Sequence, residues 1–290
     1  MNRFWVFLST AFLWVSLLIS PVALADITDL KAAVEKNDPA AQYLLGSMML
    51  KGKGVPIDQE QGLILCEKAA NQGFVLAQST LGVMYDRGDG VPQDYKKAVY
   101  WFSKAASNGD GNAQFLTGWY YFNGQGVTQD HVQAAKWFRK AADQGILIAQ
   151  DNLGAMYYHG QGFPKDYKLA AQWFRKAADQ GNAESQMKLG YMYSLGQGVP
   201  KNEKQAFNLA NKAAIQGYAP AQTYLGISYA KGEGVPQNFV QAYAWFSVAA
   251  ANGDESSVES REATASILTP EQLAKGQELA ASYFEKYQPK

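Results

Sequence analysis

The sequence is poor in the residues that build metal sites and disulfides. Its 290 residues include one cysteine, Cys66, and two histidines, His131 and His159. A single thiol cannot form a disulfide within the chain, and two histidines alone do not complete a zinc site. We interpret Cys66 as a small buried side chain and the histidines as isolated polar residues, in preference to a weak metal site made with neighbouring acids. We expect no metal and no cofactor.

An excess of charge of either sign is also absent. The 26 Lys and Arg residues balance the 26 Asp and Glu residues. Binding to nucleic acid or to an anionic membrane surface depends on concentrated positive charge, so the balance gives no electrostatic argument for either partner. We expect the basic side chains of the helices to form a solvated surface, paired locally with acids such as Asp143 and Asp179.

One apolar segment stands apart from the rest of the chain. Arg3 precedes an apolar run over residues 4–19, which is short for a membrane span, and Ala23 to Ala25 have the small residues of a cleavage site. We interpret residues 1–25 as a signal peptide cleaved after Ala25, and we expect a periplasmic or secreted protein without membrane contact after cleavage. A leader retained as a membrane anchor is the alternative.

The chain is dominated by a pattern that recurs every 36 residues. Six repeats begin with a small residue followed by glutamine, at Ala41, Ala77, Ala113, Ala149, Ser185 and Ala221. The spacing has no insertion or deletion. A fixed period in this range is typical of a solenoid, in which each repeat stacks on the next and buries a continuous core.

Each repeat is predicted to form a pair of helices. Ala149, Leu153 and Met156 are spaced as one apolar face of a helix, which we expect over about residues 147–159. Gly160 follows and suits a left-handed helix end. We call this the first helix of a repeat.

The second helix of each repeat is expected to begin after an aspartate or asparagine that serves as N-cap, such as Asp166. In four repeats a glutamine lies three residues beyond the cap, which is the spacing of a capping box, at Gln61, Gln133, Gln205 and Gln241. Second helices carry Trp-Phe pairs such as Trp173 and Phe174. No single hairpin encloses these rings, so each repeat needs its neighbour.

Two expectations concern packing. Gly154 recurs in the first helix of every repeat, although glycine costs about 1 kcal/mol relative to alanine in a helix. This choice indicates close approach of a neighbouring backbone, which we expect to be that of the second helix at its alanine pair. Trp137 matches a tryptophan in three other repeats and is expected to be a core residue, whereas Trp119 matches residues of every size and is not.

The full outline of a repeat is A-x-x-x-L-G-x-x-Y-x-x-G-x-G-V-P-x-D followed by A-x-x-W-F-x-K-A-A-x-x-G, over residues 38–253. This outline resembles the Sel-one-like repeat family, a branch of the tetratricopeptide-type repeats. The resemblance implies a right-handed α-solenoid whose first helices line the concave face, and a protein-protein interaction scaffold without catalytic activity. A cysteine-rich branch of the family is penicillin-binding or β-lactamase-like, but the single cysteine sets this chain apart from that branch.

The fold is thus predicted to be all-α, with six 36-residue repeats over residues 38–253. Residues 26–37 are expected to form a lead-in helix, and residues 254–290 to form capping helices. The last of these begins at a capping box, Thr269 to Gln272. Its apolar residues are expected to share one face, at Leu273, Leu279, Ala280, Tyr283, Phe284 and Tyr287.

Catalytic motifs are weak. The string Ser-x-x-Lys occurs at Ser185 to Lys188 and at Ser228 to Lys231, but its companions in serine enzymes, S-D-N and K-T-G, do not occur. We therefore expect no enzymatic activity, and a β-lactamase-like function remains an alternative only through the family resemblance.

Positions that differ between repeats are the candidates for recognition. On the first helix they fall at i, i+4 and i+7, where repeat three has Phe115, Trp119 and Phe122, beside Tyr158 and Tyr191. Aromatic side chains are common anchors in interfaces. We hypothesise that these five residues bind a peptide or protein segment in the concave groove. The alternatives are packing between neighbouring first helices, and stacking on the sugars of peptidoglycan or another glycan.

Overall fold

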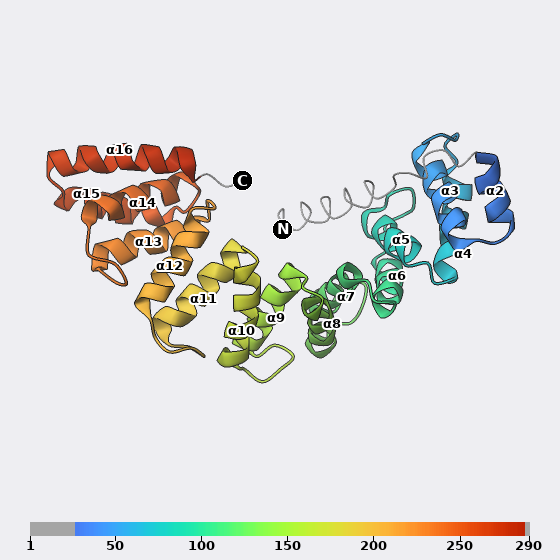
Figure 1. Cartoon of the computed structure of the whole chain (residues 1–290), viewed down its shortest axis with the longest axis horizontal. Coiled ribbons are helices and arrows are strands. Elements are labelled where there is room, and N and C mark those ends of the chain that lie inside the picture. The colour runs from blue at the N-terminus through green and yellow to red at the C-terminus, as the bar shows by residue number, and fades with distance from the viewer. Residues whose placement is uncertain (1–26, 288–290) are drawn as a thin grey trace. The chain divides into compact units, whose positions relative to one another are not determined.

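The computed structural model describes residues 27–287, and the predicted signal peptide lies outside this range. The described residues form fifteen helices and no strand, which confirms the all-α repeat fold. The described residues divide into two compact units, residues 27–110 and residues 111–287. In both units helical hairpins follow one another along the chain (Figure 1).

The first unit contains α2 (Ile27–Glu35), α3 (Pro39–Lys51), α4 (Gln59–Asn71), α5 (Val75–Arg87) and α6 (Tyr95–Ser107). The second unit contains α7 (Gly111–Asn123), α8 (His131–Asp143), α9 (Leu147–His159), α10 (Tyr167–Asp179), α11 (Ala183–Leu195), α12 (Glu203–Ala214), α13 (Ala219–Lys231), α14 (Phe239–Ala251), α15 (Ser256–Ile267) and α16 (Pro270–Lys286). The odd-numbered helices α3 to α13 are first helices, and the even-numbered helices α4 to α14 are second helices.

Helix ends follow the predicted chemistry. The first helix α9 ends at Gly160, whose φ of 76° lies in the left-handed region that glycine tolerates. The second helix α10 begins at Asp166, whose carboxylate accepts a hydrogen bond from the Leu169 backbone N–H at 2.9 Å. In repeats with a glutamine three residues beyond the cap, that glutamine's N–H makes the same bond, at Gln61, Gln133, Gln205 and Gln241.

The recurrent glycine of the first helix faces an aromatic ring. A Cβ on Gly154 would lie 2.7 Å from Cδ1 of Phe174, in the second helix of the same repeat. The same ring position blocks a side chain at Gly82, Gly118 and Gly226. The predicted approach of the second helix is confirmed, but in these repeats the expected contact with backbone at the alanine pair is wrong. A side chain at the glycine position would overlap the phenylalanine ring, so the first helix can pack against that ring only if the position is glycine.

Backbones do approach each other where the phenylalanine is missing. Repeat one has Cys66 in its place, and a Cβ on Gly46 would lie 2.7 Å from the carbonyl oxygen of Gly62. Repeat five has Ala210 there, and its Gly190 is more open, with the nearest atom to a Cβ being a carbonyl oxygen 3.3 Å away. The residue at this position of the second helix therefore determines whether the glycine contacts an aromatic ring or a backbone carbonyl group.

The Trp-Phe pairs fill the core between helices. Trp101, Trp173 and Trp245 are buried, as are the phenylalanines that follow them. Trp137 is only partly buried, and the Lys140 ammonium lies 4.2 Å from its ring centroid. Trp137 therefore lies at the edge of the core, so the expectation of an equal packing role in all four repeats is wrong.

Basic side chains of second helices contact aromatic rings. Arg139 on α8 donates a hydrogen bond to the Tyr157 hydroxyl at 2.6 Å and lies 5.0 Å from the Trp173 ring centroid. Among the described residues, Asp143 and Asp179 form no ion pair, so the expected local pairing does not occur there. These cations instead stabilise the packing of one repeat on the next through cation–π contacts.

A buried glutamine joins consecutive repeats. Gln150 of α9 donates from Nε2 to the carbonyl oxygen of Ala142, at the end of α8, at 3.1 Å. Its Oε1 accepts from Gln180, which ends α10, at 2.8 Å. The same amide chain recurs at Gln78, Gln186 and Gln222. The side-chain amide of one glutamine thus donates a hydrogen bond to a carbonyl oxygen at the end of the preceding repeat and accepts one from an amide of its own repeat.

The two ends of the repeat array are closed by different helices. At the start α2 contributes Leu30, and Asn37 accepts the hydrogen bond of Gln42 at 2.8 Å, in place of a preceding repeat. At the other end α16 begins at a complete capping box of Thr269 and Gln272, as predicted. Its residue Tyr283 lies 4.6 Å from Trp245, measured between ring centroids.

One residue of the predicted apolar face of α16 is misplaced. Phe284 is exposed, and Gly276 takes part in the buried face instead, because its missing side chain leaves room for the Tyr243 ring. A glycine carries no hydrophobic signal, so the sequence pattern did not include it.

The glycine contacts predict that the same substitution destabilises one repeat more than another. Gly154→Ala should lower the free energy of unfolding by about 1–3 kcal/mol, because its methyl group would overlap the Phe174 ring. Gly190→Ala is the matched control. It should change stability by less than about 1 kcal/mol, because alanine's better helix propensity offsets a milder contact. Urea denaturation of both variants measures this. Equal losses of unfolding free energy in the two variants would show that the ring contact is not the reason for glycine at this position.

Candidate functional site

The five predicted recognition residues lie on three first helices of the second unit. Helices α7, α9 and α11 have thirteen residues each and begin 36 residues apart. Equivalent positions therefore occupy the same turn of each helix. Phe115, Trp119 and Phe122 are on α7, Tyr158 is on α9 and Tyr191 is on α11.

Phe115 belongs to the core of its own hairpin. Its ring is 7% exposed and is stacked on Phe138 of α8, with 5.5 Å between the centroids. Phe138 in turn occupies the space left by Gly118. A ring enclosed between two helices cannot contact a partner protein. The prediction that Phe115 binds a partner segment is therefore wrong, and Phe115 is a packing residue.

Trp119 and Phe122 are partly buried and remain accessible. Trp119 meets Tyr120 edge-on, with 5.2 Å between the ring centroids. Phe122 lies 4.8 Å from His131, again edge-on. These contacts fix both rings from one side while part of each ring faces solvent.

Tyr158 and Tyr191 continue the aromatic surface on the next two first helices. The hydroxyl of Tyr158 donates to Oε1 of Gln197, in the loop after α11, at 2.9 Å. Tyr191 is 46% exposed and meets Tyr224 of α13 edge-on, at 5.4 Å. Burial of part of its ring, with a smaller contribution from Asp254, raises the pKa of the Tyr191 phenol, so it stays neutral.

Leu195 is a member of this surface that the sequence pattern did not select. It lies one turn beyond Tyr191 on α11 and is 62% exposed. The other repeats have Lys51, Arg87, Asn123, His159 and Lys231 at this position. The signal in the sequence is one apolar residue at a position that is polar in the other repeats, and the spacing i, i+4 and i+7 does not include that position.

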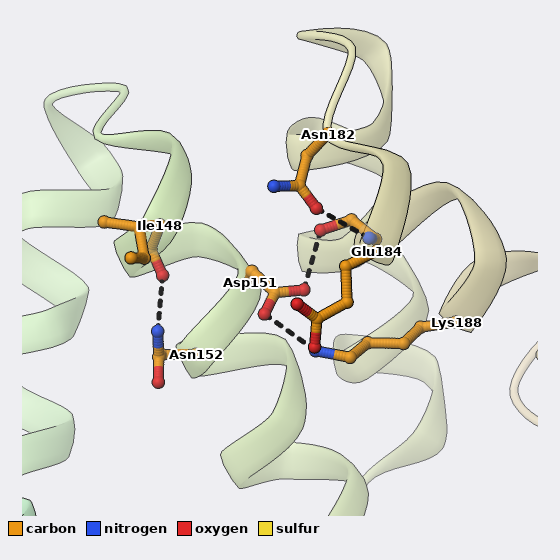
Figure 2. A network of polar contacts seen from close by, with 7 residues as sticks. Ile148, Asp151, Asn152, Asn182, Glu184 and Lys188 are labelled. Carbon is orange, nitrogen blue, oxygen red and sulfur yellow. Dashed lines mark hydrogen bonds and ion pairs between the residues drawn. The ribbon is translucent and has the colours of Figure 1, made fainter. Parts of the chain in front are cut away.

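Asp151 occupies a variable position too, yet it faces a neighbouring repeat. Figure 2 shows Lys188 of α11 reaching Asp151 of α9, with Glu184 beside it. The Lys188 ammonium lies 2.7 Å from Asp151 and 2.8 Å from Glu184, and the Ser185 hydroxyl donates to the other oxygen of Asp151 at 2.7 Å. The carboxylate thus joins two repeats and is not free for a ligand.

The charge state of this network is fixed by its members. Burial favours the neutral amine of Lys188, but Asp151 and Glu184 outweigh burial and raise the pKa of Lys188 above its ordinary value. Lys188 therefore stays charged, and the two acids that share it leave the network with a net charge of −1.

The Ser-x-x-Lys strings do not form a reactive site. Ser185 is fully buried, with its hydroxyl bound to Asp151, and Ser228 is buried within α13. A nucleophilic serine must reach the carbonyl carbon of its substrate, and neither hydroxyl is accessible.

The histidines and the cysteine are equally isolated. His131 begins α8 and His159 ends α9, and the described residues contain no group of three or more His, Cys, Asp or Glu that could hold a metal ion. Cys66 is fully buried, and burial raises the pKa of its thiol to about 12. The thiol is therefore protonated, which makes it a packing residue and not a nucleophile.

The repeats match a known family. The model of the Sel1 repeat matches residues 39–74, 75–110, 111–146, 147–182, 183–218 and 219–254. The chain belongs to the Sel1 repeat family. The resemblance predicted from the sequence is confirmed, and the repeats of this Sel1 chain extend over most of its length.

Two solved structures are similar to this Sel1 chain. A Sel1 repeat protein from Oxalobacter formigenes is 32% identical, with 83% of this chain and 99% of that chain covered and a TM-score of 0.69. A protective antigen present in uropathogenic Escherichia coli strains, c5321, displays an SLR fold and is 28% identical, with 90% and 79% covered and a TM-score of 0.54. No curated protein matches the chain.

No helix within residues 27–287 is long and apolar enough to cross a membrane. On this Sel1 repeat framework, partly exposed aromatic rings lie on three successive first helices.

The contacts predict different responses of three tryptophans to truncation. Trp173→Ala should cost about 3–5 kcal/mol of unfolding free energy, because the ring is buried between repeats. Trp119→Ala should cost less than about 1.5 kcal/mol, because part of its ring already faces solvent. Urea denaturation midpoints compare the two. An equal loss would place Trp119 in the core. Trp137→Ala should fall between them, since its ring is partly buried.

Proposed function

We propose that this chain is an exported protein-interaction scaffold, and that Trp119, Phe122, Tyr158 and Tyr191 anchor an extended segment of a partner protein. The observation that carries the proposal is the placement of partly exposed aromatic rings on three successive first helices. Membership of the Sel1 repeat family, whose members act as interaction scaffolds, supports the class of function.

The electrostatic character of this surface supports a neutral partner segment. Helix α7 has no charged residue. The charged side chains on α9 and α11 are Asp151, Glu184 and Lys188, in which two acids share one lysine and leave a net charge of only −1. Burial of apolar area is then the main source of affinity, and binding should depend little on salt.

The aromatic rings are already held in one orientation, which favours binding of a partner segment. Tyr158 is held by Gln197, and Trp119 and Phe122 each meet a neighbouring ring edge-on. A ring that is already oriented loses little conformational entropy when a partner covers it, so more of the burial energy appears as affinity.

Retention experiments test the binding proposal. The immobilised chain is offered a pool of denatured peptides from cell-envelope proteins and, separately, purified peptidoglycan. Peptides should be retained, and Trp119→Ala or Tyr191→Ala should each weaken retention by about 2 kcal/mol, or roughly thirtyfold in Kd. Tyr100→Ala is the matched control, since Tyr100 is equally exposed but lies on a second helix of the other unit.

Two outcomes contradict the proposal. Retention of peptidoglycan and not of peptides, lost in the same variants, would assign the rings to glycan binding. Equal retention by Trp119→Ala, Tyr191→Ala and the wild type would place the recognition surface elsewhere.

Export is proposed from the sequence of residues 1–25, which have the charge, apolar run and small residues of a signal peptide. Fractionation of cells that express the full chain, followed by mass measurement, tests this. The protein should be found outside the cytoplasm and begin at Asp26. A cytoplasmic protein that retains Met1 would refute export.

A further inference from the structure

Second helices of repeats three to five present a row of lysines. Lys140, Lys176 and Lys212 occupy the same place in the last turn of α8, α10 and α12, and all three are exposed. Lys140 and Lys176 lie 4.2 Å and 3.9 Å from the ring centroids of Trp137 and Trp173. We call these three residues the lysine row.

Charge near the lysine row is predominantly positive. The three helices carry eight basic and three acidic residues, an excess of five positive charges. None of the four ion pairs of the described residues involves a lysine of the row. A lysine in the last turn also interacts favourably with its own helix end, but that interaction leaves the ammonium group in water and available to a partner.

The lysine row runs across neighbouring second helices. Arg139 of α8 lies over Trp173 of α10, which places these second helices side by side. One lysine per repeat therefore gives a row that runs across the three second helices.

Helix α16 carries a complementary row of acids. Glu271, Glu278 and Glu285 are exposed and lie seven residues apart, on the side of α16 opposite Tyr283. Seven residues of α-helix advance by about 10.5 Å along one face. We call these residues the glutamate row, and the segment 254–287 around it has seven acidic and three basic residues.

The two rows cannot meet within one chain. Tyr283 and Tyr287 of α16 pack on Trp245 of α14, with ring centroids 4.6 Å and 5.7 Å apart. The Tyr283 hydroxyl also donates to Gln241 at 3.0 Å. These contacts hold α16 on repeat six, with the glutamate row facing away from its own repeats.

We propose that the lysine row docks α16 of a second copy of this chain, with Glu271, Glu278 and Glu285 each opposite one lysine of Lys140, Lys176 and Lys212. The charges of the two rows are opposite, and each row has three members. The glutamates lie along one helix and the lysines lie across three, so α16 of the second copy runs across α8, α10 and α12. The contact is heterologous, because the two surfaces differ, and it joins copies head to tail.

Such an interface depends on salt. Exposed ion pairs contribute little singly, and dissolved ions screen them. Sedimentation velocity of the full chain should show reversible self-association at about 20 mM salt and monomers at about 500 mM, where the screening length falls from roughly 20 Å to roughly 4 Å. This response separates the contact from the neutral aromatic surface, whose binding should persist at high salt.

Charge reversal tests the pairing itself. One variant carries Glu271→Lys, Glu278→Lys and Glu285→Lys, and the other carries Lys140→Glu, Lys176→Glu and Lys212→Glu. Each variant alone should associate at least roughly tenfold more weakly than the wild type, because like charges then meet. An equal mixture of the two should associate again, because the reversed rows complement each other.

Matched controls change the same charge elsewhere. Glu255→Lys, Glu259→Lys and Glu262→Lys alter α15 and its start, and Lys165→Glu, Lys201→Glu and Lys231→Glu alter loops and a first helix. Both control variants should associate like the wild type. Circular dichroism checks that every variant is folded.

Three outcomes overturn the proposal. A wild type that stays monomeric at low salt has no such contact. Association that survives both reversals does not use these rows. Failure of the folded variants to associate on mixing shows that the two rows do not face each other.

Discussion

The buried glutamine amide is the contact on which the stacking of repeats depends. Gln150 accepts a hydrogen bond from Gln180 of its own repeat and donates one to Ala142 of the preceding repeat. Loss of that amide would leave buried polar groups without partners, each at about 1–3 kcal/mol. Because the bonds have one geometry, they impose the same orientation at each junction where they form, and the apolar side chains then pack in a repeated way.

In each repeat, some positions of the first helix hold the repeats together and others are free to vary. The glycine, the Phe ring and the amide hold each hairpin and its neighbour, and they leave the remaining positions of the first helix free to vary. Some variable positions still serve junctions: Asp151 joins two repeats through Ser185 and Lys188. Others, such as Tyr191 and Leu195, face solvent. Variation between repeats alone does not distinguish the two uses.

The second unit carries two surfaces of different character. First helices offer neutral aromatic rings, and second helices offer exposed cations, while α16 at the end of the array is acidic. A chain with balanced overall charge can therefore still be strongly polarised. The equal numbers of basic and acidic residues in the sequence do not indicate how these charges are distributed over the surface.

The sequence alone determined the period, the helices, their caps and the family, because these depend on local spacing and on residues such as Asp166 and Gly160 whose conformational preferences are local. Only the tertiary structure decided which rings are buried. Phe115 is enclosed because Phe138 lies above it, and Trp137 is partly exposed although its counterparts are not. Burial depends on what the neighbouring helices supply, and the period of a single repeat does not contain that information.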